Sequence, residues 1–271
     1  MLLGGFDGLH VGHRKLLDRA KKSGLSVGIM TMSGVKEENS LFTFSERESI
    51  FQETGVDFVF ELPFADVKDL SPSEFLSLLE KEFAPKLFVC GADFRFGKRA
   101  LGTPQNIKEG TQVCVEVLDL VEMEGEKVSS SRIKRLLAEG NIEIANMLLG
   151  HSFFLEGEVY EDRKIGRTIG VPTANIAYPN EKFPLKKGVY ETRVEVDGVT
   201  YKAITNFGAR PTFGNGEVLT ETHLLGFEGD LYGRTLRVEF VRYLREIQRF
   251  ESVEELKTQL GKDGRQVRDH D

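Results

Sequence analysis

The feature that most constrains the fold is a change in hydrophobic period near the middle of the chain. Up to residue 149, short apolar runs alternate with segments of helical spacing, whereas from residue 150 onward apolar and polar residues alternate with a period of two. The chain has 271 residues, and domains of about 150 residues are typical. We therefore predict two domains, 1–149 and 150–271.

The first half favours an α/β fold. Residues 73–83 have helical spacing and follow Ser71 and Pro72, a pair that often begins a helix. Two shorter helices are predicted at 131–138 and 142–149. The predicted buried strands are 27–32, 56–62, 86–90 and 113–120. Because strands and helices alternate, we expect a parallel, doubly wound sheet.

The second half favours an antiparallel sheet. Tyr190 falls on one face of a predicted strand, and Glu191 and Glu195 fall on the other, where we expect both glutamates to be exposed. The following Asp197-Gly198 pair is typical of a tight hairpin turn, and the stretch TLRVEFVRYL repeats the alternation. A small antiparallel β-barrel is therefore predicted. A C-terminal helix is indicated by apolar residues spaced three and four apart, namely Val253, Leu256 and Leu260.

Composition excludes several classes of protein. No apolar run approaches the roughly 18 residues of a membrane helix, so we expect no membrane span. The net charge of -7 predicts a surface that repels nucleic acid. No signal peptide is visible, which favours a cytoplasmic location. Cys90 and Cys114 each lie in an apolar run, so we expect two buried free thiols.

The stretch GGFDGLHVGH near the start of the chain carries the densest set of functional residues. We expect Leu2 and Leu3 to end a strand and a helix to begin near His13. A loop between a strand and a helix start attracts anions, because free backbone amides and the helix dipole point into it. His10 and His13 can face the same space, and Gly12 leaves room for a phosphate. The alternatives are a structural metal, for which no third ligand stands nearby, and a plain polar loop.

A second stretch, VSSSRIKRLL at residues 128–137, places three serines and Arg132 at the start of a predicted helix. Capping of that helix is the alternative to phosphate binding, since serine hydroxyls cap helices and arginine pairs with phosphate. The two stretches together resemble the signatures of the nucleotidyltransferase superfamily, whose H-x-G-H residues contact the triphosphate of ATP or CTP. The resemblance implies a nucleotidyltransferase-type, Rossmann-like first domain.

The stretch GADFRFGKR is not a P-loop, although its glycines and lysine suggest one. A P-loop has four residues between its glycines and a Ser or Thr after the lysine, whereas here five residues intervene and Arg99 follows Lys98. The longer stretch CGADFRFGK is similar to that of the FMN adenylyltransferases within the superfamily. This similarity implies a flavin substrate, with Gly91 as a binding residue and Asp93, Phe94 and Phe96 on the flavin side. Packing in the core is the alternative for Phe94 and Phe96.

Three stretches interrupt the strand pattern of the second half: GRTIGVPTAN, NFGARPT and ETHLLGFEGDLYG. Polar clusters of this size exceed what solvent-facing turns need. In this order they resemble the riboflavin kinase domain. The whole chain is similar to the prokaryotic bifunctional FAD synthetases. This resemblance implies that riboflavin and ATP give FMN and ADP, and that FMN and ATP then give FAD and pyrophosphate.

For the kinase half, the resemblance implies riboflavin and ATP as substrates and Mg²⁺ as cofactor. Thr173 and Asn175 match the family's metal ligands, and both offer the hard oxygen donors that magnesium prefers. Glu221 matches the general base that accepts the proton of the riboflavin 5′-hydroxyl. The other expected binding residues are Gly166, Arg167, Gly170 and Pro172 of the phosphate loop, together with Asn206 and Arg210.

For the adenylyltransferase half, the phosphate of FMN is already an anion, so its oxygen attacks the α-phosphorus without a general base. The resemblance assigns His10, His13 and Arg132 to catalysis. The expected binding residues are Gly5, Phe6, Asp7, Gly8 and Gly12 of the first stretch, and Ser129, Ser130 and Ser131 of the second.

Two alternatives stay open. A cytidylyltransferase or adenylyltransferase for another phosphate ester would explain the first half and leave the second unexplained. A flavin-binding regulatory protein would keep the pockets and lack turnover. We expect only small-molecule partners, ATP, riboflavin, FMN and FAD, with no nucleic acid and no membrane, and a chain that is a monomer or a weak homo-oligomer.

Overall fold

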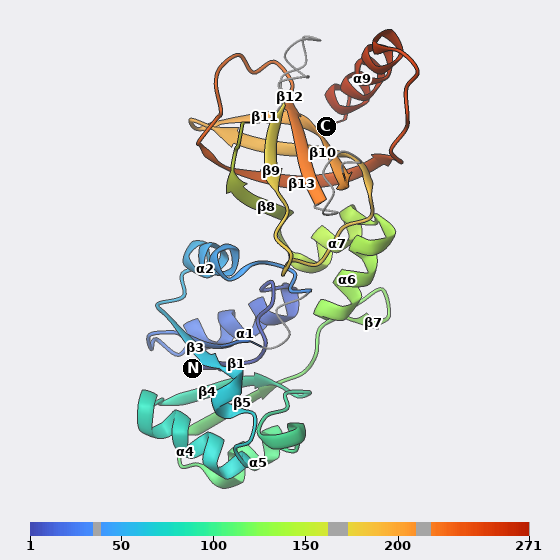
Figure 1. Cartoon of the computed structure of the whole chain (residues 1–271). Coiled ribbons are helices and arrows are strands. Elements are labelled where there is room, and N and C mark those ends of the chain that lie inside the picture. Colours follow the sequence, from blue (N-terminus) through green and yellow to red (C-terminus); the bar gives the residue numbers. More distant parts are fainter. Residues whose placement is uncertain (35–38, 162–172, 210–217, 271) are drawn as a thin grey trace. The chain divides into compact units, whose positions relative to one another are not determined.

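The computed structural model (Figure 1) describes residues 1–34, 39–161, 173–209 and 218–270. Its contacts form two compact units, Met1–Arg132 and Ile133–Asp271. The domain limits 1–149 and 150–271 stay a prediction. Each unit is described by itself below.

The first unit is built on a five-stranded sheet in the order β3-β2-β1-β4-β5, and every pairing between neighbours is parallel. This architecture confirms the predicted doubly wound α/β sheet. The four strands predicted from apolar runs are all present, each shifted by a few residues. The strands are β1 (Leu2–Leu3), β2 (Gly28–Ser33), β3 (Phe58–Pro63), β4 (Leu87–Gly91) and β5 (Cys114–Leu118).

Local signals in the sequence explain where the helices of this unit begin. Ser71 accepts a hydrogen bond from the Glu74 amide and Pro72 occupies the first turn of α4, as the sequence predicted. The helices are α1 (Val11–Lys21), α2 (Phe44–Glu53), α3 (Phe64–Val67), α4 (Pro72–Phe83) and α5 (Pro104–Gly110), with a 3₁₀ turn at Lys98–Ala100 and a small hairpin of β6 (Glu122–Met123) and β7 (Glu126–Lys127).

The two cysteines have different environments. Cys90 lies in β4, inside the sheet, and is buried, as expected. Cys114 is exposed, so the prediction of two buried thiols was wrong for this residue. The reason is topological: Cys114 begins β5, which lies at the edge of the sheet and has a neighbouring strand on one side only.

The helices α6 (Ser130–Glu139) and α7 (Ile142–Leu149) lie close to their predicted limits. Gly140 separates them with a φ of 86°, a value that favours glycine. The Asn146 side chain of α7 accepts the Phe153 amide at 2.7 Å and donates to the Phe240 carbonyl at 2.8 Å. These bonds join α7 to the strands that follow.

The second unit contains a six-stranded antiparallel sheet in the order β8-β13-β10-β11-β12-β9. A bridge between Tyr160, just beyond β8, and Asn175 of β9 joins the two edges, which confirms the predicted β-barrel. The strands are β8 (Phe153–Glu158), β9 (Ala174–Ala177), β10 (Gly188–Val196), β11 (Val199–Ala209), β12 (Val218–Leu224) and β13 (Thr235–Arg245).

The β10–β11 hairpin turns at Asp197 and Gly198, where φ is 52° and 77°. Positive φ at both central residues is the geometry expected of the predicted tight turn. Glu195 is exposed, as expected, whereas Glu191 is fully buried. The expectation for Glu191 was wrong because a further element covers this part of the sheet.

The covering element is α9 (Val253–Arg268), which confirms the predicted C-terminal helix. Its buried residues are Asp263, Gly264 and Val267, while Val253 is 46% exposed. The apolar spacing therefore predicted the helix correctly but not which of its residues pack against the barrel. Val267 packs with Val189 and Ile204 on the outer face of β10 and β11.

Candidate active sites

The first candidate site is the opening loop, residues 4–10, which connects β1 to α1. His10 caps α1: its Nδ1 atom accepts the His13 amide at 3.3 Å, and its carbonyl accepts the Arg14 amide at 2.9 Å. The rings of His10 and His13 are stacked, with centroids 3.7 Å apart. The structure thus brings the two predicted histidines together at a helix N-terminus.

The contacts of the histidines determine their charge and the position of the proton. Burial lowers the pKa of His10 to about 4. Burial, and then the charges of His10 and Lys127, lower the pKa of His13 well below its usual value. Both rings are therefore neutral near pH 7. Because Nδ1 of His10 accepts a hydrogen bond, the proton of this ring lies on Nε2, which makes Nε2–H a donor.

The opening loop has an unusual backbone. Phe6 and Leu9 have φ values of 42° and 43°, although both carry side chains and both are fully buried. Such conformations cost about 1 to 3 kcal/mol each and often occur at functional sites. A Cβ atom on Gly12 would lie 3.1 Å from the His10 ring, so this glycine gives the ring its room. Asp7 ties the loop to the residues after β2 by accepting the Leu41 amide at 2.9 Å.

The structure adds Lys127 to this site, a residue that the sequence analysis missed. Lys127 forms an ion pair with Asp93, one of the predicted residues. Its charge lowers the pKa of both histidines, whereas Asp93 raises that of His10. A Cβ atom on Gly91 would lie 3.0 Å from an Asp93 oxygen. The position of Lys127, directly before the serine-rich stretch, was the only signal in the sequence.

The two phenylalanines of CGADFRFGK have different surroundings. Phe96 is buried in the core of the first unit, and Phe94 is half-buried beside it, with the two rings stacked at 5.6 Å. Phe94 therefore borders the core and keeps part of its surface accessible.

The serine-rich stretch begins α6. The Ser129 hydroxyl accepts a hydrogen bond from the Arg132 amide at 3.3 Å, so Ser129 caps the helix. The Arg132 guanidinium donates to the carbonyls of Met123 and Glu126 at 2.8 and 3.0 Å, and it pairs with the Glu126 carboxylate. Arg132 thus fixes the β6–β7 hairpin that carries Lys127. Ser130 and Ser131 lie in the first turn of α6.

The second candidate site is a row of three side chains across neighbouring strands, which we call the kinase row: Asn175, Glu221 and Asn206. Glu221 of β12 is paired with Asn175 of β9 on one side and with Asn206 of β11 on the other. Directly paired residues of an antiparallel sheet project from the same face. The Asn206 amide nitrogen donates to Glu221 at 3.5 Å. Register therefore assembles three predicted residues that lie far apart in the sequence.

The kinase row contains unsatisfied acceptors. The Oδ1 atoms of Asn175 and Asn206 are buried and have no hydrogen-bond partner among the described residues. An unpaired buried carbonyl costs free energy, so each is a place where a ligand donor or a cation would be favoured. Asn175 is buried, and its amide oxygen is a hard donor that fits magnesium.

Thr173, the second predicted metal ligand, lies directly before β9 and lines a small pocket. Asp230, which the sequence analysis did not select, lines the same pocket. The other lining residues are mostly apolar: Val159, Ala174, Leu224, Phe227, Gly229, Leu231 and Tyr232. The predicted residues Gly166, Arg167, Gly170, Pro172 and Arg210 lie outside the described residues.

No helix in the described part of the chain is long and apolar enough to cross a membrane. Comparison with solved structures finds a crystal structure described as a macrolide-efflux protein from Streptococcus pneumoniae. It has a TM-score of 0.89 and 30% identity, and the match covers all of this chain and 93% of that one.

Comparison with known families identifies both halves. Residues 1–132 match the family model for FAD synthetase and residues 149–270 that for riboflavin kinase. The bifunctional riboflavin kinase/FMN adenylyltransferase of Bacillus subtilis is 32% identical over 97% of this chain and 89% of its own length. The protein of the same name from Pseudomonas fluorescens is 34% identical over 96% and 89%. The chain therefore belongs to the family of bifunctional riboflavin kinases/FMN adenylyltransferases.

Proposed function

We propose that the two activities of this family, riboflavin kinase and FMN adenylyltransferase, use the two sites described above. As a family member, the chain phosphorylates riboflavin to FMN and converts FMN to FAD with ATP. The kinase row would carry the first reaction and the opening loop the second. The observation that carries the assignment is the register that sets Glu221 between Asn175 and Asn206, whose buried amide oxygens have no partner among the described residues.

In the kinase reaction, Glu221 accepts the proton of the riboflavin 5′-hydroxyl while that oxygen attacks the γ-phosphorus of ATP and ADP leaves. The Asn206 amide holds the carboxylate in place from the neighbouring strand. Asn175 and Thr173 would hold a Mg²⁺ ion through an amide oxygen and a hydroxyl. When bound, Mg²⁺ neutralises charge on the phosphates of ATP.

In the adenylylation, a phosphate oxygen of FMN attacks the α-phosphorus of ATP and pyrophosphate leaves. The reaction needs alignment and charge stabilisation more than proton transfer. His10, neutral and protonated on Nε2, donates to a phosphate oxygen, and His13 stacks against it to fix the ring. Lys127 adds a cation beside both rings, and Arg132 holds the hairpin that presents it. Gly5, Gly8 and Gly12 keep the loop open to the triphosphate.

The test is a time course of the purified chain with riboflavin, ATP and magnesium, with the flavins separated by chromatography. FMN that appears first and FAD that follows would support both sites. Unchanged riboflavin, with flavin bound and no ATP consumed, would favour the regulatory alternative. Turnover with CTP but not ATP would favour the cytidylyltransferase. Omitting magnesium tests the metal, because both products should disappear.

The cytoplasmic location and the monomer or weak homo-oligomer stay predictions. Gel filtration of the same preparation measures the oligomeric state.

A further inference from the structure

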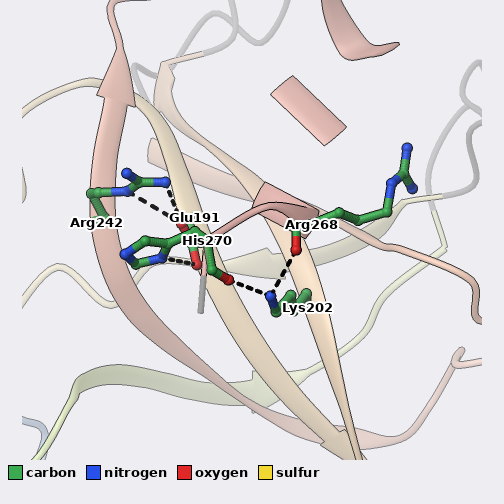
Figure 2. Close-up of polar contacts among 5 residues, drawn as sticks. All are labelled: Glu191, Lys202, Arg242, Arg268 and His270. Atoms are coloured by element: carbon green, nitrogen blue, oxygen red, sulfur yellow. Dashed lines mark hydrogen bonds and ion pairs between the residues drawn. The ribbon is translucent and has the colours of Figure 1, made fainter. Parts of the chain in front are cut away.

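An ion cluster around the buried Glu191 joins the end of α9 to the barrel (Figure 2). Glu191 of β10 is 0% exposed, and its Oε2 atom accepts from Nε and Nη2 of Arg242, its partner residue in β13, at 3.2 and 2.8 Å. Its other oxygen lies 2.8 Å from Nδ1 of His270. A carboxylate is costly to bury unless donors surround it, and these two residues supply donors to both oxygens.

A third strand holds the same end of the helix. The Lys202 ammonium group, on β11, donates to the carbonyl of Arg268 at 3.1 Å and to the carbonyl of His270. The carbonyls at the end of a helix lack partners and attract cations. Arg268 offers only its carbonyl, since its side chain points away from the cluster (Figure 2). Three adjacent strands, β13, β10 and β11, therefore fix the end of α9.

This end of α9 lies next to the kinase row. Val267 of α9 packs on Val189 and Ile204. Val189 is the cross-strand partner of Asn206, and Ile204 precedes Asn206 by two residues on the same face of β11. Two residues further along, a Cβ atom on Gly208 would lie 2.5 Å from Ile247. The segment after β13 thus covers β11 on both sides of Asn206.

We propose that Glu191 is a positioning residue of the riboflavin kinase reaction. By binding His270 it fixes the end of α9 beside Asn206 and Glu221. The end of α9 then forms one wall of the riboflavin site, and this wall is ordered before riboflavin binds. The inference rests on the proposed assignment of the kinase row to the kinase reaction. Helix ends fray readily, and the apparent Kd of a substrate that needs an ordered wall is its intrinsic Kd divided by the fraction of molecules in which the wall is ordered.

The experiment compares variants of the full chain in steady-state kinetics. His270→Ala removes one donor and leaves the Glu191–Arg242 pair, so the barrel stays folded. The KM for riboflavin should rise about tenfold, the loss expected for one charge-assisted hydrogen bond, while kcat stays within about twofold. FMN adenylylation should not change. His270→Gln, whose amide can donate to the same oxygen, should restore most of the affinity.

Glu191→Gln should raise the same KM, and the matched control is Glu195→Gln, an exposed glutamate on the same strand. Hydrogen exchange gives an independent readout, because the amides of residues 263–268 should exchange about tenfold faster in His270→Ala. A KM that stays normal while exchange accelerates would overturn the inference, since α9 would then form no wall for riboflavin. Unchanged exchange would also overturn it, because the cluster would not be holding the helix.

Glu221→Gln separates this inference from the proposed function. If that variant still makes FMN at the normal rate, the kinase row itself is assigned wrongly. If it is inactive and His270→Ala has a normal KM for riboflavin, only the role of Glu191 falls.

Discussion

The opening loop and the kinase row hold their functional side chains by different means. His10 and His13 come from one loop and the helix that follows it, and strained residues, Phe6 and Leu9, shape the backbone between the strand and the helix. Asn206 and Glu221 instead lie on paired strands, and the register of the sheet sets their spacing. A local site depends on its own loop, whereas a register-built site depends on the whole barrel.

The two sites also treat charge differently. Burial keeps both histidines of the opening loop neutral, so they act as hydrogen-bond donors and the nearby cation is Lys127. The kinase row combines one carboxylate with two amide oxygens that have no partner among the described residues. The first arrangement suits phosphate groups and the second suits a hydroxyl proton and a metal ion. Variants that affect one reaction alone can test this contrast.

The largest effect is expected from Glu221→Gln. The amide cannot accept the proton of riboflavin, so FMN formation should fall by about 100-fold or more, the usual contribution of a general base. Conversion of supplied FMN to FAD should stay normal, because the opening loop is untouched. Chromatographic assay of both reactions measures the change, with Glu195→Gln as the matched control. Equal loss of both activities would show that the role of Glu221 is not specific to the kinase reaction.

His10→Ala should give the reverse pattern. It removes the cap of α1 and the proposed phosphate donor together, so FAD formation should fall by about 100-fold, as when one donor to a developing charge is lost. Riboflavin phosphorylation should stay within about twofold, because His10 is not part of the kinase row. The same assay serves, with His151→Ala as a control histidine in the second unit. Unimpaired FAD formation would remove the role given to this residue.

The smallest effect expected is on stability, through the pKa of His10, which burial lowers from 6.5 to about 4. Below pH 6.5 the unfolded chain binds a proton that the folded chain excludes. The free energy of unfolding is therefore highest above this pH and decreases as the pH falls toward 4. Between pH 7 and pH 5 the loss should be about 2 kcal/mol for this one group. The shift of the His13 pKa acts in the same direction.

Hydrogen exchange of β1 and β4 at both pH values measures that loss for the first unit. His10→Asn is the comparison, because asparagine can still cap α1 and does not titrate in this range. Its stability should depend less on pH than that of the wild-type chain. Identical pH dependence of the two proteins would mean that His10 is not the group responsible.

The part of the fold that could be predicted is the part governed by local patterns. Period and capping signals located α4 and α7 almost to the residue, and the Asp197-Gly198 pair located its hairpin. Alternation also predicted the buried side of β10 correctly. It could not predict that α9 covers Glu191, because a period of two distinguishes the faces of a strand and not what lies over them.

The candidate sites follow the same division. His10 and His13 are neighbours in the sequence, so their contact could be expected from spacing alone. Lys127 could not be found this way, because it reaches the histidines only through a hairpin that Arg132 holds. Asp230 lies within the quoted stretch ETHLLGFEGDLYG, but it was missed because only the structure shows that it lines the same pocket as Thr173. The kinase row was expected from resemblance, and only the pairing of strands explains its geometry.

If ATP binds at Asn175 as proposed, the bridge that closes the barrel would be stabilised by the nucleotide. The Tyr160 amide donates to the carbonyl of Asn175 at 3.1 Å, so the residue that would hold the metal also forms the seam between the two edges of the sheet. β9 has only four residues, so we expect this seam to open more readily than the longer strand pairings. Nucleotide bound at Asn175 would stabilise the closed barrel, because a ligand that binds only the closed form shifts the equilibrium toward that form by mass action. The seam between Tyr160 and Asn175 would then open least often when ATP is bound and more often after ADP leaves.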